Sequence, residues 1–130
     1  MVLSMAKKTP RIAVVDDDPF VLRGLRRLLR SAGFDVDSYA SGAEFLNADT
    51  HDAPDCLVLD LNMPQMTGFD VQVLLARSGK STPVIVITGD DTPEAHSRAL
   101  RLGAKACLEK PVDQSTLLAA IGIAIGGVAP

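Results

Sequence analysis

The sequence predicts an α/β fold, a three-layer α/β/α sandwich around a five-stranded parallel sheet. Two observations support this prediction. From Arg11 onward, short runs of β-branched and aliphatic residues alternate with longer segments of helical period. The run at 57–59 is apolar at every position, as expected of a central strand that is buried on both faces. Right-handed crossovers would then place helices on both faces of the sheet.

Five strands are predicted, at residues 12–15, 34–39, 57–59, 84–87 and 105–109. The second alternates apolar with acidic or polar side chains, which is typical of a half-buried outer strand. For strands and helices that alternate in this way we expect the sheet order 2-1-3-4-5, the flavodoxin-like arrangement.

Five helices are predicted: 19–33, a short one from Ser41 that ends before Asp52, one from Gly68, one at 92–103, and one that Asp113 caps. Pro19 suits the first turn of a helix, and Gly103 suits a helix end. In the third helix, the apolar pattern predicts that Phe69, Val73 and Leu74 point towards the core.

The chain is long enough for one compact domain and too short for two. We expect a single domain over residues 10–126, with a flexible tail at 1–9 and a second tail at 127–130. No effector domain is expected beside it. The sequence leaves open whether the chain stands alone or is a piece of a longer protein.

Charge and composition disfavour several classes of protein. The 16 acidic and 13 basic residues give a net charge of −3 and a pI near 5.2, which disfavours a nucleic-acid-binding surface. The most apolar stretch, 117–129, is interrupted by glycines and is shorter than the roughly 20 residues that span a bilayer, so no membrane anchor is expected. The scattered cysteines and histidines form neither a disulfide framework nor a zinc motif, and a cytoplasmic location is expected.

Polar and charged residues collect where the predicted strands end. Strand one is followed by Asp16–Asp18, strand three ends in Asp60, strand four in Thr88 and strand five in Lys110. In such a sheet, ligands bind at the carboxyl ends of the strands. If strands one and three are neighbours, about 4.8 Å apart, Asp17 and Asp60 repel each other and need a cation between them. Carboxylate and carbonyl oxygens with water favour Mg2+, and Lys110 would add a fixed positive charge.

Four motifs occur in order at these strand ends: Val14–Asp18, Leu59–Pro64 with Gly68, Ile87–Gly89, and Lys110–Pro111. With them the chain resembles the receiver domain of two-component response regulators, and in particular single receiver domains like the chemotaxis regulator. The resemblance covers Arg11 to Ile125. It implies a signalling domain that accepts a phosphoryl group and switches its surface for downstream interaction, and not a turnover enzyme on an external substrate.

The resemblance also implies a role for each site residue. Asp60 is the phosphoacceptor, and it ligates Mg2+ together with Asp17 and the backbone carbonyl of Asn62, while Asp16 acts through coordinated water. Thr88 bonds one phosphoryl oxygen and Lys110 pairs with another. The donor is a phosphohistidine on a sensor histidine kinase or a histidine phosphotransfer protein, or a small acyl phosphate. A cis peptide bond is expected between Lys110 and Pro111.

Other classes remain alternatives. Phosphatases with an aspartyl-phosphate intermediate also use a strand-end Asp and Mg2+, but many carry a second Asp two residues on, where this chain has Asn62. A flavin-binding electron carrier shares the fold, but an acidic pocket with Lys110 suits a phosphoryl group better. A pseudo-receiver that is not phosphorylated and acts as a protein-interaction module is the main alternative.

At one position the chain departs from the family pattern, because Cys107 stands where an aromatic switch residue is usual. We interpret Cys107 as a small buried hydrophobe, and we expect no disulfide with Cys56 because strand four separates the two. The resemblance places Asn62 and Asp90 beside the path of the water that hydrolyses the acyl phosphate. Gly89 leaves this path open, so a lifetime of minutes is expected.

Two surfaces are candidates for partners. The first helix carries four arginines on its outer face, at positions 23, 26, 27 and 30, which are either a solvated face or a docking rim for the phosphohistidine partner. Residues 114–130 carry no charge. Helix four, strand five and helix five therefore form a candidate homodimer or effector interface, unless the small Ala and Gly residues expose too little apolar area to matter.

Overall fold

The computed structural model describes residues 9–48, 53–89 and 92–126. Among these residues five parallel strands form one sheet in the order β2-β1-β3-β4-β5, which confirms the predicted fold class. The strands are β1 (Arg11–Val15), β2 (Asp35–Tyr39), β3 (Cys56–Asp60), β4 (Val84–Thr88) and β5 (Ala106–Glu109). The helices are α1 (Pro19–Ser31), α2 (Gly42–Asn47), α3 (Gly68–Arg77), α4 (Pro93–Arg101) and α5 (Gln114–Gly126).

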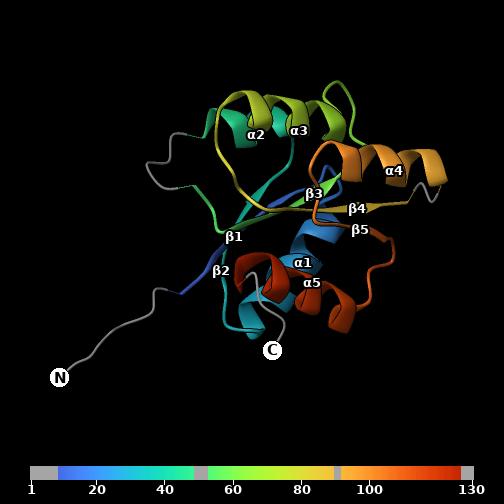
Figure 1. Cartoon of the computed structure of the whole chain (residues 1–130). Coiled ribbons are helices and arrows are strands. Elements are labelled where there is room, and N and C mark those ends of the chain that lie inside the picture. The colour runs from blue at the N-terminus through green and yellow to red at the C-terminus, as the bar shows by residue number, and fades with distance from the viewer. Residues whose placement is uncertain (1–8, 49–52, 90–91, 127–130) are drawn as a thin grey trace.

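The helices cover both faces of the sheet. Figure 1 shows α2, α3 and α4 on one face, with α1 and α5 on the other. Each face has its own apolar core: Val15, Leu59 and Val86 point to the first, and Val14, Val58 and Ile85 point to the second. Because successive strand residues point to opposite faces, strands buried on both sides are apolar throughout.

Local sequence signals account for the helix boundaries. Asp18, Ser41, Thr67 and Thr92 each accept a hydrogen bond from a backbone N–H in the first turn of the following helix. Asp113 does the same for Thr116 at the start of α5, as predicted. Helix α2 ends at Asn47, and residues 49–52, where its predicted end fell, lie outside the described residues.

The predicted core face of α3 is wrong at Leu74 and only partly right at Phe69 and Val73. Buried residues are Val71, Gln72 and Leu75, whereas Leu74 is 38% exposed, Val73 is half-buried and Phe69 is partly buried against the core. The cause is the contact at Gly68, which fixes the rotation of the helix. A Cβ at Gly68 would lie only 2.5 Å from the Asp60 carbonyl oxygen, so this turn of α3 lies directly against the end of β3.

Three further expectations concern the chain as a whole. Cys56 and Cys107 are free thiols, on β3 and β5 with β4 between them. The predicted tails, 1–9 and 127–130, lie outside the described residues except for Thr9. Within the described residues, no helix is both long enough and apolar enough to cross a membrane.

Candidate functional site

The carboxyl ends of the strands bring four of the predicted site residues to one edge of the sheet. In the parallel register Val15 pairs with Leu59, and Asp60 pairs with Ile87. Asp16 and Thr88 therefore follow directly at either side of Asp60. Lys110 joins them from the end of β5, where its backbone N–H donates to the Thr88 carbonyl over 2.8 Å. The predicted cis peptide bond between Lys110 and Pro111 is present.

The three consecutive aspartates differ in their surroundings. Asp16 is fully buried, and its Oδ1 accepts a hydrogen bond from the backbone N–H of Asp18 over 2.9 Å. Asp18 caps helix α1, since its Oδ1 accepts from the backbone N–H of Phe20 over 2.9 Å. Asp17 between them is exposed. The sequence shows an acidic run, but the fold assigns one aspartate to the site interior, one to its rim and one to a helix cap.

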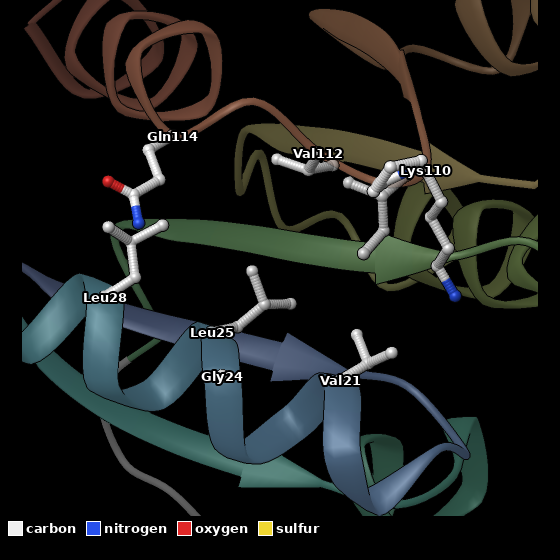
Figure 2. Close-up of a pocket in the computed structure, with 9 residues that line it drawn as sticks. Val21, Gly24, Leu25, Leu28, Lys110, Val112 and Gln114 are labelled. Atoms are coloured by element: carbon white, nitrogen blue, oxygen red, sulfur yellow. The ribbon is translucent and has the colours of Figure 1, made fainter.

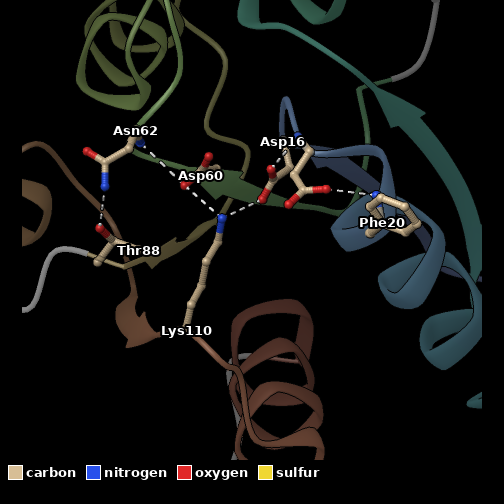
Figure 3. Close-up of polar contacts among 7 residues, drawn as sticks. Asp16, Phe20, Asp60, Asn62, Thr88 and Lys110 are labelled. Atoms are coloured by element: carbon tan, nitrogen blue, oxygen red, sulfur yellow. Dashed lines mark hydrogen bonds and ion pairs between the residues drawn. The ribbon is translucent and has the colours of Figure 1, made fainter.

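Lys110 links the two buried carboxylates. Its Nζ lies 2.9 Å from Asp16 Oδ2 and 3.3 Å from Asp60 Oδ1, and Figure 3 shows the ammonium between them. Asp60 is 2% exposed, and its Oδ1 also accepts from the backbone N–H of Asn62 over 3.3 Å. Among the described residues, both contacts of the Asp60 carboxylate thus fall on Oδ1, which leaves Oδ2 as the oxygen available to a ligand.

The electrostatics follow from burial and from like charge. Burial raises the pKa of Asp60 to about 6, and the Asp16 carboxylate adds to the rise, while Lys110 and the Asn62 N–H oppose it. Burial alone would lower the pKa of Lys110, but the adjacent Asp16 and Asp60 outweigh it, so this pKa is raised. Lys110 therefore stays protonated, whereas the ionised form of Asp60 is disfavoured by burial and lowers the stability of the fold.

The acidic residues fit a hard divalent cation. Asp16, Asp17 and Asp60 each offer a carboxylate oxygen, and these oxygens lie within 4.8 Å of one another. Asp16 Oδ2 is buried, and the neighbour that the structure gives it is the Lys110 ammonium at 2.9 Å. Three carboxylates face one ammonium. A cation that prefers oxygen ligands and keeps bound waters, such as Mg2+, would bind these carboxylate oxygens and offset their excess negative charge.

Several contacts near the site have no signal in the sequence pattern. The Asn62 side-chain amide donates to the Thr88 hydroxyl over 3.3 Å, between two residues 26 positions apart. Two contacts tie α3 to α4: the Arg98 guanidinium lies 4.2 Å from the centre of the Phe69 ring, and buried Gln72 donates to the Ala99 carbonyl over 2.9 Å. Such pairs depend on tertiary packing, and no local motif encodes them.

Cys107 is half-buried on β5 and packs against the core on the side of α2, α3 and α4. Burial raises the pKa of its thiol, with a further rise from Glu109, so the thiol is protonated and poorly nucleophilic at neutral pH. Full burial was expected and is not found, but the interpretation as a small hydrophobe agrees with this environment. Asp90, the other position tied to water access, lies outside the described residues.

A groove beside the site opens between α1 and the segment that joins β5 to α5. It has a volume of about 480 Å³ and is lined mainly by apolar side chains of Val21, Leu25, Leu28 and Val112. In Figure 2, Lys110 lies at one end of the groove and Gln114 at the other. The groove thus runs from the helix face to the charged site.

The fold and the site define a class of protein, a flavodoxin-like α/β domain with an acidic strand edge bridged by a lysine. A family model for the response regulator receiver domain matches residues 12–122. The chain belongs to this family of two-component signalling domains.

Individual relatives agree with this assignment. The response regulator protein TodT of Pseudomonas putida is 37% identical over 121 residues, which is 93% of this chain and 53% of that protein. The response regulator protein TmoT of Ectopseudomonas mendocina is 40% identical over 114 residues, covering 88% of this chain and 52% of that protein. The solved structure of the response regulator StyR matches with a TM-score of 0.83 and 39% identity, over 92% of this chain and 60% of that one. The chain therefore spans about half the length of the curated relatives named here.

The electrostatics predict a stability difference that depends on pH. In EDTA at pH 8, Asp60→Asn is expected to be more stable than the parent by about 1–3 kcal/mol, because it removes a buried charge. Folding raises the pKa of Asp60 from 3.8 to about 6, so the folded state binds this proton more tightly. The parent therefore loses stability as the pH rises through this window, and the difference closes near pH 4. Urea unfolding from pH 4 to pH 8 measures it.

The exposed Asp35→Asn provides the matched control, since it removes a carboxylate from β2 outside the site. Its stability relative to the parent should change little over the same pH range. A parent that is as stable as Asp60→Asn at pH 8 without metal would contradict the assigned cost of the buried charge.

Proposed function

We propose that this domain accepts a phosphoryl group on Asp60 in a Mg2+-dependent reaction and thereby switches its surface for a downstream partner. The observation that supports this most strongly is the buried Asp60 carboxylate, with Oδ1 held by Lys110 and Asn62 and with two further carboxylates beside it. A single buried, oriented carboxylate next to a fixed cation suits a nucleophile towards phosphorus.

The chemistry requires only positioning and charge neutralisation. An Asp60 carboxylate oxygen attacks phosphorus, the P–N bond of a phosphohistidine breaks, and the electron pair of that bond returns to the imidazole nitrogen. Lys110 pairs with one phosphoryl oxygen, and the Thr88 hydroxyl donates a hydrogen bond to another. Hydrolysis of the acyl phosphate returns Asp60 to a carboxylate. The domain promotes its own modification and is not a turnover enzyme.

Asp17, Asp60 and the Asn62 backbone carbonyl would hold Mg2+, with Asp16 acting through bound water. When bound, Mg2+ neutralises phosphoryl and carboxylate oxygens during the transfer. The Lys110 ammonium offsets the negative charge of the Asp16 and Asp60 carboxylates, and these carboxylates offset its positive charge. A water on the bound metal would also give the buried Asp16 Oδ2 a second partner beside Lys110.

The proposed donor is a sensor histidine kinase or a histidine phosphotransfer protein in the cytoplasm, where free thiols such as Cys56 and Cys107 are stable. The apolar groove along α1 and the exposed arginines 23, 26, 27 and 30 offer a docking face next to Lys110. The homodimer or effector interface at α4, β5 and α5 stays a prediction. Leu100 on α4 and Ile123 on α5 are large apolar side chains that are each 50% exposed.

Incubation with acetyl phosphate and Mg2+ is expected to add one phosphoryl group to the parent and none to Asp60→Asn. The gain should be lost in EDTA, because the metal neutralises the oxygens that meet during transfer. Intact-mass spectrometry at short times measures it, with Asp35→Asn as a control that should be modified like the parent. No gain, even with phosphoramidate, would favour a pseudo-receiver that acts by binding alone.

The docking proposal is tested with two donors. Replacing both Arg23 and Arg27 by Ala should slow transfer from a phosphohistidine protein by about tenfold, because charges at the rim act mainly on association. Modification by acetyl phosphate should be unchanged, since the small donor needs no docking face. Replacing Arg77 and Lys80 on the α3 side by Ala removes the same charge elsewhere and should slow neither reaction. Equal slowing with both donors would reject a docking role for the α1 arginines.

A further inference from the structure

Asn62 contacts two residues of the proposed site at once. Its backbone N–H donates to Asp60 Oδ1 and its side-chain amide donates to Thr88 Oγ1, each over 3.3 Å. Figure 3 shows these contacts in a row along the strand edge. The residue thus bridges the carboxylate of β3 and the hydroxyl of β4 with a single loop position.

The direction of the side-chain bond matters. A threonine hydroxyl has one proton to donate and two lone pairs with which to accept. The Asn62 amide nitrogen can only donate, so Thr88 is the acceptor in this bond. The bond therefore restricts the rotation of the hydroxyl, and a hydroxyl that accepts a hydrogen bond can still donate one.

The burial of Thr88 limits the orientations that its hydroxyl can take. Thr88 is fully buried and β-branched, so its hydroxyl has few alternative positions. Asn62 is exposed, which means that its side chain can be changed without opening a cavity in the core. A preoriented donor stabilises a charged oxygen more than a donor that must first reorganise.

We propose that Asn62 is a positioning residue, whose side-chain amide orients the Thr88 hydroxyl so that the hydroxyl proton is presented to a phosphoryl oxygen on Asp60. This inference rests on the proposed function, because it assigns a role in recognition of the phosphoryl group. It concerns the side chain only and is separate from the Asn62 backbone carbonyl. The opposite role, a latch that holds Thr88 away from the phosphoryl group, makes the opposite prediction.

Beryllofluoride with Mg2+ serves as the phosphoryl analogue, and NMR titration of the whole chain measures its dissociation constant. Asn62→Leu has nearly the same size and no hydrogen-bonding group. It should weaken binding roughly three- to tenfold, the range for loss of one hydrogen bond. The same change at Asn47, exposed at the end of α2, is the matched control and should leave binding unchanged.

A double-mutant cycle separates positioning from a general structural effect. In the Thr88→Val background there is no hydroxyl to orient, so Asn62→Leu should have no further effect. In Thr88→Ser the hydroxyl is kept, and the effect should reappear. Tighter or unchanged binding by Asn62→Leu, or an equal loss with Val at position 88, would overturn the proposal while the proposed function stands. A parent that binds no beryllofluoride and gains no phosphoryl group would overturn both.

Discussion

The ammonium of Lys110 between two buried carboxylates is the interaction on which the site depends. Asp16 and Asp60 come from neighbouring strands, and neither could stay charged at this depth without a cation nearby. The sheet order puts the two carboxylates side by side, and the backbone contact between Lys110 and Thr88 brings the lysine to them. One ammonium does not balance three acidic side chains. The remaining negative charge suits this edge to a divalent cation.

Much of the fold follows from the sequence because its signals are local. Uninterrupted apolar runs mark strands buried on both faces, and cap residues such as Thr67 and Thr92 mark the helix starts. The rotation of α3 could not be read in this way. It is set by the approach of Gly68 to the Asp60 carbonyl, a contact between the helix and the strand before it, and it buries polar Gln72 while leaving Leu74 exposed.

The site was predictable where chemistry follows from position in the chain. A residue that ends a parallel strand must lie at the carboxyl edge, so Asp60, Thr88 and Lys110 could be placed together in advance. The different positions of Asp16, Asp17 and Asp18 could not be predicted, because they depend on which carboxylate the turn after β1 buries. The contacts between α3 and α4 could not be predicted from the sequence either. Cys107 has no ring to move. Contacts of Phe69 with Arg98 and of Gln72 with Ala99 link α3 to α4, in addition to the apolar packing between these helices.

We propose that Asp16, Asp17 and Asp60 form a single divalent-cation site beside Lys110. An NMR titration of backbone amides with Mg2+ at neutral pH tests it most directly. The account predicts saturable shifts, with one ion per chain, confined to the loops after β1 and β3, and a large loss of affinity in Asp17→Asn. Shifts that do not saturate, or that are the same in Asp17→Asn and the parent, would contradict it.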